Sequence, residues 1–354
     1  VAECIGAGIK PVMITGDHKV TAAAIAKEIG ILKDISEAAE GSEIDDLTDE
    51  QLREYVPTKS VYARVSPEHK IRIVKAWQDR GNIVAMTGDG VNDSPALKRA
   101  DVGFAMGSGT EAAKEAGKIV ILDDNFKSIK DAILYGRTIY HNILKFCKFQ
   151  LVINVAAVVV SAIAPFFGVD EPLKVTHLLF VNLVMDGLGA MMLGNEPAKE
   201  EYMAEAPRKR DESIVSKKMM GQILTMGIWL TVVSFIYLKV PFFVNLFANE
   251  EQHLTGYFVL FIVAALFNGF NVRDDGFAIF AGLNENKDFI KVFLIIIIVQ
   301  ALLVNAAIVP LAPFQWIGEM FSCVPFGIKG WIAVVLLACT MIPADMVRKL
   351  CVNK

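Results

Sequence analysis

The sequence has little cysteine, and its cysteines are not arranged in pairs. Five occur among 354 residues, and none has the close partner that a zinc site or a disulfide framework requires. They are Cys4, Cys147, Cys323, Cys339 and Cys351. We expect them to be reduced residues that contribute to packing.

The sequence also lacks an excess of positive charge and a targeting segment. The net charge is -4, and the basic residues fall in loops between apolar runs, which argues against a nucleic-acid partner. Val1 opens directly into an amphipathic stretch, without an initiator methionine or a positively charged signal segment. We therefore expect the chain to be a piece of a longer protein.

Apolar residues, by contrast, are abundant. They make up 54% of the chain, which is too many for an ordinary soluble domain, and the charged residues are concentrated in the first part. This distribution predicts a soluble domain over residues 1–126 and a membrane domain over residues 127–354.

Up to about residue 122, short apolar runs alternate with helical patterns, which is typical of a parallel sheet with crossover helices. The expected strands cover residues 11–14, 61–63, 83–86, 102–105 and 119–121, and the expected helices include residues 20–30 and 67–79. Residues 32–58 are acidic and weakly periodic, so we interpret them as a surface excursion. The pattern predicts an α/β, Rossmann-like fold.

Polar side chains follow the third of these expected strands. Residues 83–97 predict a strand, a loop with Asp89, Asn92 and Asp93, and a helix that begins with Ser-Pro. Ligands of open α/β sheets bind at the carboxyl ends of the strands. Two carboxylates and an amide at this place suit a hard cation held between protein and phosphate. The alternative is a solvated turn without chemistry.

A second polar turn, formed by Thr15, Gly16 and Asp17, follows the first expected strand and precedes a helix. Its hydroxyl and N–H groups are expected at the same sheet edge as Asp89, where the two turns can clasp one phosphoryl group. Lys70, which follows Ser-Pro-Glu-His, can supply a cation for the phosphate charge. By itself each feature has a plain alternative: a strand-to-helix turn, and a solvated lysine.

The loop Met-Thr-Gly-Asp-Gly-Val-Asn-Asp-Ser-Pro-Ala-Leu at residues 86–97 resembles the hinge motif of P-type ATPases, the phosphorylated cation pumps. Its one departure is Ser94, where the family usually has alanine. The resemblance implies a haloacid dehalogenase-like cytosolic part that transfers a phosphoryl group from ATP to an aspartate.

Carried over residue by residue, the resemblance assigns roles to the phosphate side of the site. Thr15 and Gly16 would hold phosphate oxygens, and Asp17 would support the nucleotide side. Lys70 would neutralise the charge of the transferring phosphoryl group.

On the metal side, the resemblance implies that Asp89 ligates Mg²⁺. Asp93 would belong to the metal shell, and Asn92 would help to orient the phosphate. The nucleophile is missing, because the chain contains no Asp-Lys-Thr-Gly, no Thr-Gly-Glu and no nucleotide-binding domain. By itself the chain is not expected to form the phosphoenzyme, and the missing amino-terminal half of the pump is its expected partner.

Beyond residue 125 the pattern changes to one long helix, expected to serve as a stalk of roughly 40 residues and about 60 Å. Six membrane spans are expected at residues 147–167, 175–194, 219–238, 256–271, 289–311 and 328–346. Lys and Arg gather after the second and fourth spans and at the end of the chain. The six spans predict an all-α, multi-pass membrane domain. The basic segments predict that both of its termini face the cytosol.

Asn182 and Asp186 are four residues apart in the second span and are therefore expected on one helix face. A carboxylate at membrane depth is costly and points to function, although a structural interhelical hydrogen bond is the alternative. Asn154 in the first span is a third expected oxygen donor. Gly187 and Gly189 would permit local unwinding that exposes carbonyl groups. Such oxygens suit Ca²⁺.

Residues 179–197 resemble the sixth membrane helix of calcium pumps. Ala157, Met185 and Ala265 stand where endoplasmic-reticulum-type pumps carry two Glu residues and a Thr, all of them ligands of one of two calcium sites. The resemblance is thus to plasma-membrane-type calcium pumps with a single site. No intramembrane Cys-Pro-Cys of heavy-metal pumps occurs.

Two alternatives remain open. One is a P-type pump of the same architecture for Mn²⁺, Na⁺ or H⁺. The other is a truncated, inactive membrane protein that acts as a subunit or regulator.

Overall fold

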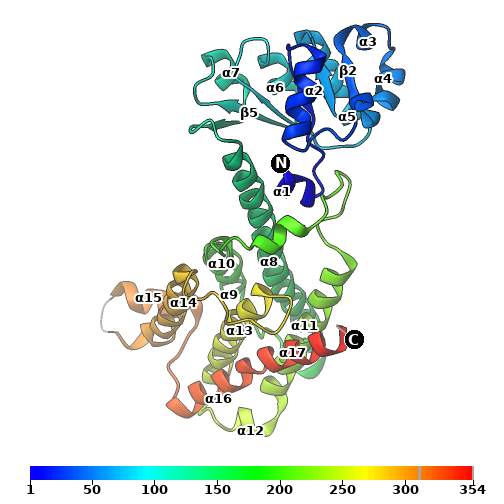
Figure 1. The fold of residues 1–354 in the computed structure, drawn as a ribbon. Helices are drawn as coiled ribbons and strands as arrows, with labels where there is room; N and C mark the ends of the chain where they lie inside the picture. The colour runs from blue at the N-terminus through cyan, green and yellow to red at the C-terminus, as the bar shows by residue number, and fades with distance from the viewer. Residues whose placement is uncertain (310–311, 353–354) are drawn as a thin grey trace. The chain divides into compact units, whose positions relative to one another are not determined.

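The protein is described by a computed structural model that covers residues 1–309 and 312–352. The chain forms two compact units, which Figure 1 shows as a ribbon. The α/β unit comprises Val1–Arg137 and Ala198–Ser213, and the helical unit comprises Thr138–Pro197 and Ile214–Lys354.

The α/β unit contains two parallel sheets. Its described strands are β1 (Met13–Ile14), β2 (Ala38–Glu40), β3 (Val61–Ala63), β4 (Ala85–Gly88), β5 (Val102–Met106) and β6 (Ile119–Ile121). One sheet has the order β1-β3-β2 and the other the order β4-β5-β6. The predicted parallel α/β fold is confirmed, but two three-stranded sheets replace the single expected sheet. β1 and β4 are end strands of their sheets.

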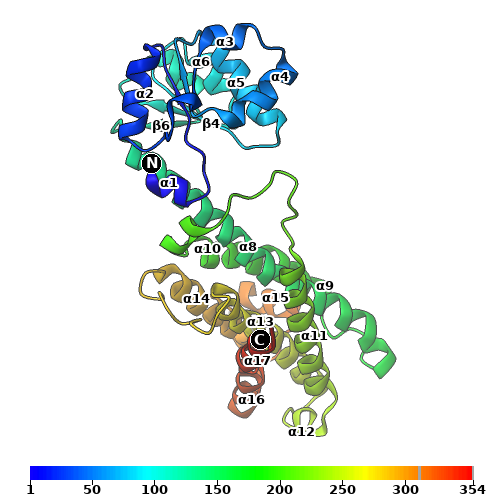
Figure 2. The same cartoon turned by 45° about the vertical axis from the view of Figure 1, so that its right-hand side comes forward.

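Short helices connect these strands. They are α1 (Ala2–Gly6), α2 (Lys19–Glu28), α3 (Gly41–Asp45), α4 (Asp49–Tyr55), α5 (Pro67–Asp79), α6 (Ser94–Arg99) and α7 (Glu111–Ala116), with 3₁₀ turns at Ile35–Glu37, Val56–Thr58 and Glu200–Ala204. α5 has the predicted bounds because Ser66 accepts a hydrogen bond from the His69 N–H and Pro67 occupies the first turn. Figure 2 shows α3 and α4 beside α5.

The prediction that residues 32–58 form a surface excursion is wrong. This segment contains β2, α3 and α4, and its residues Ala39, Ile44 and Leu52 are almost fully buried. They pack against Tyr62 and the α5 residue Ile73 in one hydrophobic cluster. The elements are three to seven residues long, which is too short for a visible periodicity among the acidic residues.

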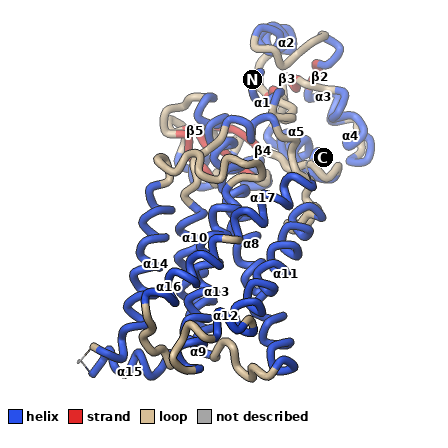
Figure 3. The backbone as a smooth tube through the Cα atoms, turned by 90° about the horizontal axis from the view of Figure 1, so that it is seen from below, coloured by secondary structure: helices blue, strands red, loops and turns tan. Residues whose placement is uncertain are grey.

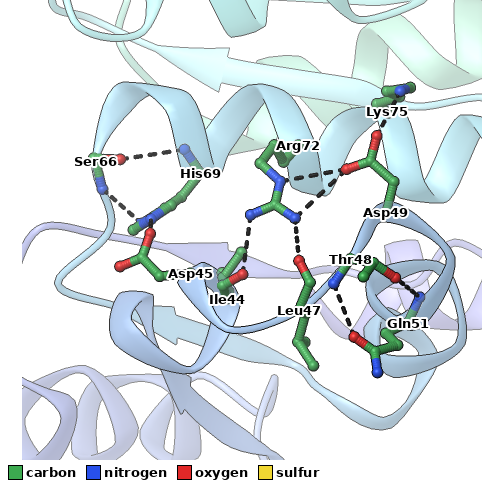
Figure 4. A network of polar contacts seen from close by, with 10 residues as sticks. All are labelled: Ile44, Asp45, Leu47, Thr48, Asp49, Gln51, Ser66, His69, Arg72 and Lys75. Atoms are coloured by element: carbon green, nitrogen blue, oxygen red, sulfur yellow. Dashed lines mark hydrogen bonds and ion pairs between the residues drawn. The ribbon is translucent and has the colours of Figure 1, made fainter.

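A polar network holds this segment on α5, as Figure 4 shows. The Arg72 guanidinium donates to the carbonyl oxygens of Ile44 at 2.9 Å and Leu47 at 2.5 Å. The His69 Nε2 lies 2.7 Å from an Asp45 carboxylate oxygen, and Lys75 pairs with Asp49. The segment therefore belongs to the folded core that carries α5.

A second set of polar contacts is centred on Glu43 of α3. Its carboxylate accepts hydrogen bonds from the Tyr55 hydroxyl at 2.7 Å, the Glu40 N–H at 2.9 Å and the Lys19 ammonium at 3.1 Å. Partial burial alone would raise the pKa of this carboxyl, but the three donors prevail and lower the pKa to about 2.

The segment 198–213 packs within the α/β unit. Arg137 donates to the carbonyl oxygens of Tyr202 at 2.7 Å and Glu205 at 2.8 Å, and also to that of Ala7 at 2.8 Å. Arg210 forms an ion pair with Asp101, which also accepts the Val84 N–H at the start of the second sheet.

The helical unit is built from apolar helices of very different lengths. They are α8 (Phe126–Ile163, shared with the α/β unit), α9 (Val175–Phe180), α10 (Asp186–Gly194), α11 (Lys217–Lys239), α12 (Pro241–Val244), α13 (Glu250–Arg273), α14 (Lys287–Asn305), α15 (Ala312–Phe321), α16 (Ile328–Cys339) and α17 (Met341–Val352). 3₁₀ turns cover Ala164–Phe167 and Ala306–Ile308, and a π-helical turn at Val181–Met185 joins α9 to α10. Figure 3 shows these helices side by side.

Six candidate membrane spans occur among the described residues, which confirms the prediction. They are Phe126–Phe167, Val175–Gly194, Lys217–Lys239, Glu250–Arg273, Lys287–Asn305 and Ile328–Val352. The first span includes the predicted stalk, because the single helix α8 runs for 38 residues without a break. The fifth was expected to reach residue 311. Its helix α14 ends at Asn305, and residues 310–311 lie outside the described part of the chain.

α13 is the core of the helical unit. Of its most apolar 18-residue window, 94% is buried, whereas 28–50% of the corresponding windows in the other spans is buried. A helix that is apolar all round can be enclosed by lipid or by protein, and the burial of α13 shows that other helices of this unit enclose it. The outer helices instead expose large apolar side chains such as Leu183, Ile298 and Leu336, as expected for surfaces that face lipid.

A buried ionic network closes the end of α10. The Glu196 carboxylate accepts hydrogen bonds from Arg273 and Asn286, both at 2.7 Å. Asn142 of α8 donates to the carbonyl oxygens of Gly194 and Glu196 at 3.0 Å. Glu196 and Arg273 are each less than a tenth exposed, so the loss of either one would leave the other as a buried, unpaired charge.

Replacement of Glu43 by Gln tests the folded state of residues 38–58. We expect the free energy of unfolding to fall by about 1 kcal/mol at pH 7, a small effect because the carboxylate is partly exposed. The lowered pKa means that native Glu43 stabilises the fold above pH 4.5 and loses this effect as the pH falls toward about 2. The Gln variant should therefore show a flatter pH dependence of proteolysis in this segment. The exposed Glu50 supplies the control, because E50Q should leave the profile unchanged.

Candidate functional site

Asp93 organises the loop that follows β4. One of its carboxylate oxygens accepts a hydrogen bond from the Lys70 ammonium at 2.6 Å. The other lies 3.3 Å from the N–H groups of both Asp89 and Gly90. The Lys70 and Asp93 side chains are mostly buried, with exposures of 14% and 10%. Loss of either partner of such a pair is costly, because it leaves an uncompensated charge away from water.

The loop depends on a glycine at position 88. A Cβ atom there would lie 2.4 Å from the Cβ of Asp93 and 2.7 Å from its Cγ. Only a residue without a side chain lets Asp93 approach the end of β4 so closely. Gly90 has no such restriction, since its nearest neighbour would be an Asp93 oxygen at 3.7 Å.

Asp89 and Asn92 differ from Asp93 both in burial and in their side-chain contacts. Both residues are exposed, and within the described residues neither side chain forms a hydrogen bond with another group. The backbone of Asp89 is nevertheless fixed, because its carbonyl oxygen accepts the Thr110 N–H at 2.7 Å. An exposed carboxylate on a fixed backbone is suited to bind a hard cation from solution.

The turn at residues 15–17 is held by its own side chains. The Thr15 hydroxyl donates to the Asp17 carboxylate at 2.8 Å and accepts the Asp17 N–H at 3.1 Å. Gly16 is exposed, and a Cβ on it would meet no atom within 4 Å. The turn leaves β1, whereas Asp89 follows β4, so the two turns lie on different sheets rather than on the one sheet edge expected.

Helix α5 joins these two sheets. Its Ile73 packs in the cluster that contains Tyr62 of β3, and its Val74 packs in the cluster that contains Met86 of β4. Lys70 projects from the same helix to Asp93. The structure thus brings Lys70 and the Asp89 loop together. Among the described residues, no hydrogen bond connects Thr15 to either of them.

A second polar site lies in the helical unit. Asp186, at the start of α10, is 8% exposed, and one of its carboxylate oxygens accepts a hydrogen bond from the Gln150 amide of α8 at 2.6 Å. The π-helical turn Val181–Met185 directly precedes it. Turns of this type are rare and frequently mark functional positions within helices.

Asn182 is exposed and Asp186 is buried, and Asn182 lies within the π turn that precedes Asp186. One expectation for this segment needs correction. The expected unwinding at Gly187 and Gly189 is absent in the described helix α10, which runs regularly from Asp186 to Gly194. The irregular turn precedes Asp186 instead.

Of the remaining predicted donors, Asn154 is half-buried on α8. Within the described residues its side chain and that of Asn182 form no hydrogen bond. The described residues also contain no cluster of three or more His, Cys, Asp or Glu that could hold a metal. A cation here would therefore be bound by one carboxylate together with amides.

Sequence reasoning missed Gln150, the side chain in contact with Asp186. The signal was present, since Gln150 and Asn154 are four residues apart on one helix. Gln150 escaped notice because an amide near the start of a span looks like an ordinary interfacial residue.

The fold and these two sites define a class: a membrane protein with a haloacid dehalogenase-like domain and six membrane-crossing helices. Residues 1–101 match the family model of haloacid dehalogenase-like hydrolases, and residues 170–351 match that of the C-terminus of cation transporting ATPases. The chain belongs to the cation-transporting ATPase family.

Similar proteins span nearly the whole chain. Calcium-transporting ATPase 1 of Lactococcus lactis is 40% identical, covering 96% of this chain and 37% of its own length. Calcium-transporting ATPase 1 of Bacillus cereus is 40% identical, covering 99% and 40%. The plasma membrane-type calcium-transporting ATPase 9 of Arabidopsis thaliana is 36% identical, covering 99% and 32%. The chain thus spans 32–40% of the length of these relatives.

The pair of glycines in the β4 loop provides a matched test of its geometry. We expect Gly88→Ala to displace Asp93, break its ion pair with Lys70 and destabilise the loop by about 1–3 kcal/mol, as overpacking does. Gly90→Ala should be tolerated. Hydrogen exchange over residues 88–94, followed by mass spectrometry, should accelerate in G88A and stay near native in G90A. Equal exchange in both variants would contradict the described contact.

Proposed function

We propose that the chain is the carboxyl-terminal part of an ATP-driven calcium pump that works through an aspartyl-phosphate intermediate. Residues 1–126 are the latter portion of its phosphorylation domain, and residues 127–354 are its stalk and six-helix transmembrane domain. The observation that carries the proposal is one chain with both an Asp93-organised acidic loop and a buried intramembrane carboxylate, Asp186. The calcium-transporting relatives support the choice of ion.

At the phosphate site, Lys70 neutralises charge on the transferring phosphoryl group, and its bond to Asp93 fixes the ammonium before phosphate arrives. The N–H groups around Gly16 hold phosphate oxygens, and the Thr15 hydroxyl joins them when its single proton turns from the Asp17 carboxylate to the phosphate. Positioning and charge stabilisation make up most of phosphoryl-transfer catalysis.

On the metal side, Asp89 is the residue that fits Mg²⁺, because its carboxylate is exposed and free of described partners. Mg²⁺, when bound, supplies positive charge for the phosphate oxygens. Asp93 contributes indirectly by holding the Asp89 and Gly90 N–H groups in place. Asn92, exposed beside them, orients the phosphate.

The nucleophilic aspartate and the ATP site come from the missing amino-terminal half of the pump. β1 and β4 are end strands, so each offers unpaired backbone groups on which a further strand can add. The polar residues of both turns stand at the carboxyl ends of these two strands.

In the membrane, Asp186, Asn182 and Asn154 are oxygen donors for one transported Ca²⁺. Calcium prefers about 6–8 oxygen ligands, so elements outside this chain complete the site. The basic segments after the second and fourth spans and at the end of the chain support an orientation with both termini in the cytosol. The plasma-membrane-type relative supports location in the cell membrane.

Two variants of the complete protein, one at each site, test the proposal. In inside-out vesicles, native protein should take up ⁴⁵Ca²⁺ when ATP is added, and Asp186→Asn should abolish uptake while phosphorylation by inorganic phosphate persists. Asp89→Asn should abolish phosphorylation while equilibrium Ca²⁺ binding persists.

The alternatives predict different results. If the native ATPase responds to Mn²⁺, Na⁺ or H⁺ but not to Ca²⁺, the pump assignment holds and the calcium assignment is wrong. If the complete protein forms no phosphoenzyme at all, the chain belongs to an inactive subunit.

A further inference from the structure

The hydrogen bond between Gln150 and Asp186 is the starting point. Gln150 belongs to α8 and Asp186 to α10, and the amide nitrogen lies 2.6 Å from the carboxylate oxygen. Gln150 is half-buried and Asp186 buried. An ionised carboxylate can only accept hydrogen bonds, so the group that faces it is the N–H₂ end of the amide.

The packing of the two helices creates this contact. The ring of Phe149, the residue next to Gln150, fills the notch at Gly189, where an added Cβ would meet it at 2.7 Å. Phe149 is fully buried. Gly189 stands three residues after Asp186 in the same helix. The close approach of α8 to α10 thus brings Gln150 opposite Asp186.

This hydrogen bond gives the Asp186 carboxylate a partner when no cation is present. A buried carboxylate without a partner is costly in a surrounding of low dielectric constant. The Gln150 amide supplies a donor without adding a second charge. A cation that binds Asp186 has to replace this donor, and the same amide carries an oxygen that can serve as a ligand.

We infer that Gln150 belongs to the cation site: its N–H group holds Asp186 when the site is empty, and its carbonyl oxygen turns toward the cation when one binds. This inference rests on the proposed function, in which Asp186 binds the transported Ca²⁺. It adds a fourth side chain to Asp186, Asn182 and Asn154. Gln150 and Asn154 are four residues apart, so α8 offers two amides on one face.

Equilibrium ⁴⁵Ca²⁺ binding to the complete, purified protein tests the inference. Gln150→Leu keeps the size of the side chain but removes both the donor and the oxygen, and we expect Ca²⁺ affinity to fall by about 10- to 100-fold, as for lost partners of metal sites. Gln150→Glu retains an oxygen at the same reach. We therefore expect it to bind Ca²⁺ at least as tightly as native protein.

Two controls separate a site effect from a folding effect. Gln300 of α14 is fully buried and its amide atoms have no hydrogen-bond partner in the described structure. Gln300→Leu should therefore leave Ca²⁺ affinity unchanged. Phosphorylation by inorganic phosphate without Ca²⁺ should reach native levels in Q150L, because the α/β unit is unaltered.

Three results would overturn the inference while leaving the proposed function intact, provided that Asp186→Asn abolishes binding. The first is native affinity in Q150L. The second is an equal loss in Q150L and Q150E, which would show that the oxygen is not a ligand. The third is an equal loss in Q150L and Q300L. If native protein binds no Ca²⁺ at all, the proposed function itself fails.

Discussion

Two carboxylates held away from water determine the geometry of both candidate sites, because a buried charge is tolerated only beside a suitable donor. Asp93 meets this condition through the Lys70 ammonium and two backbone N–H groups. Asp186 meets it through the neutral Gln150 amide. The difference has a chemical consequence. In the proposed function, the first carboxylate is fixed in its loop and leaves the exposed Asp89 to bind metal, whereas the second is held by a neutral partner that a cation can displace.

Helix α8 carries residues that bond within each of the two units. α8 contributes Gln150 to the membrane site, and about 20 Å earlier along its axis it contributes Arg137 to the α/β unit. The chain that leaves α10 continues into residues 198–213, whose carbonyl groups Arg137 binds. α10 and α8 are therefore each continuous with segments of the α/β unit.

Elements with a long apolar run, a clear helix cap or a strong motif could be predicted from the sequence. The six spans, α5 and the Asp89 loop are of this kind, because hydropathy and helix caps are local properties. Residues 38–58 could not, since β2, α3 and α4 are short and owe their stability to contacts with α5. The π turn at Val181–Met185 could not be predicted either, because nothing in the local sequence marks it. Gln150 was missed because its importance depends on where Phe149 packs.

The most direct test of the account is whether the two sites communicate. Both are proposed to operate in one pump, so Ca²⁺ at Asp186 should change the reactivity at Asp89, as linkage between coupled sites requires. Phosphorylation of the complete protein by inorganic phosphate should be measured against Ca²⁺ concentration. We expect Ca²⁺ to suppress the phosphoenzyme in native protein and to have no effect in Asp186→Asn. Equal suppression in both proteins, or in neither, would contradict the account.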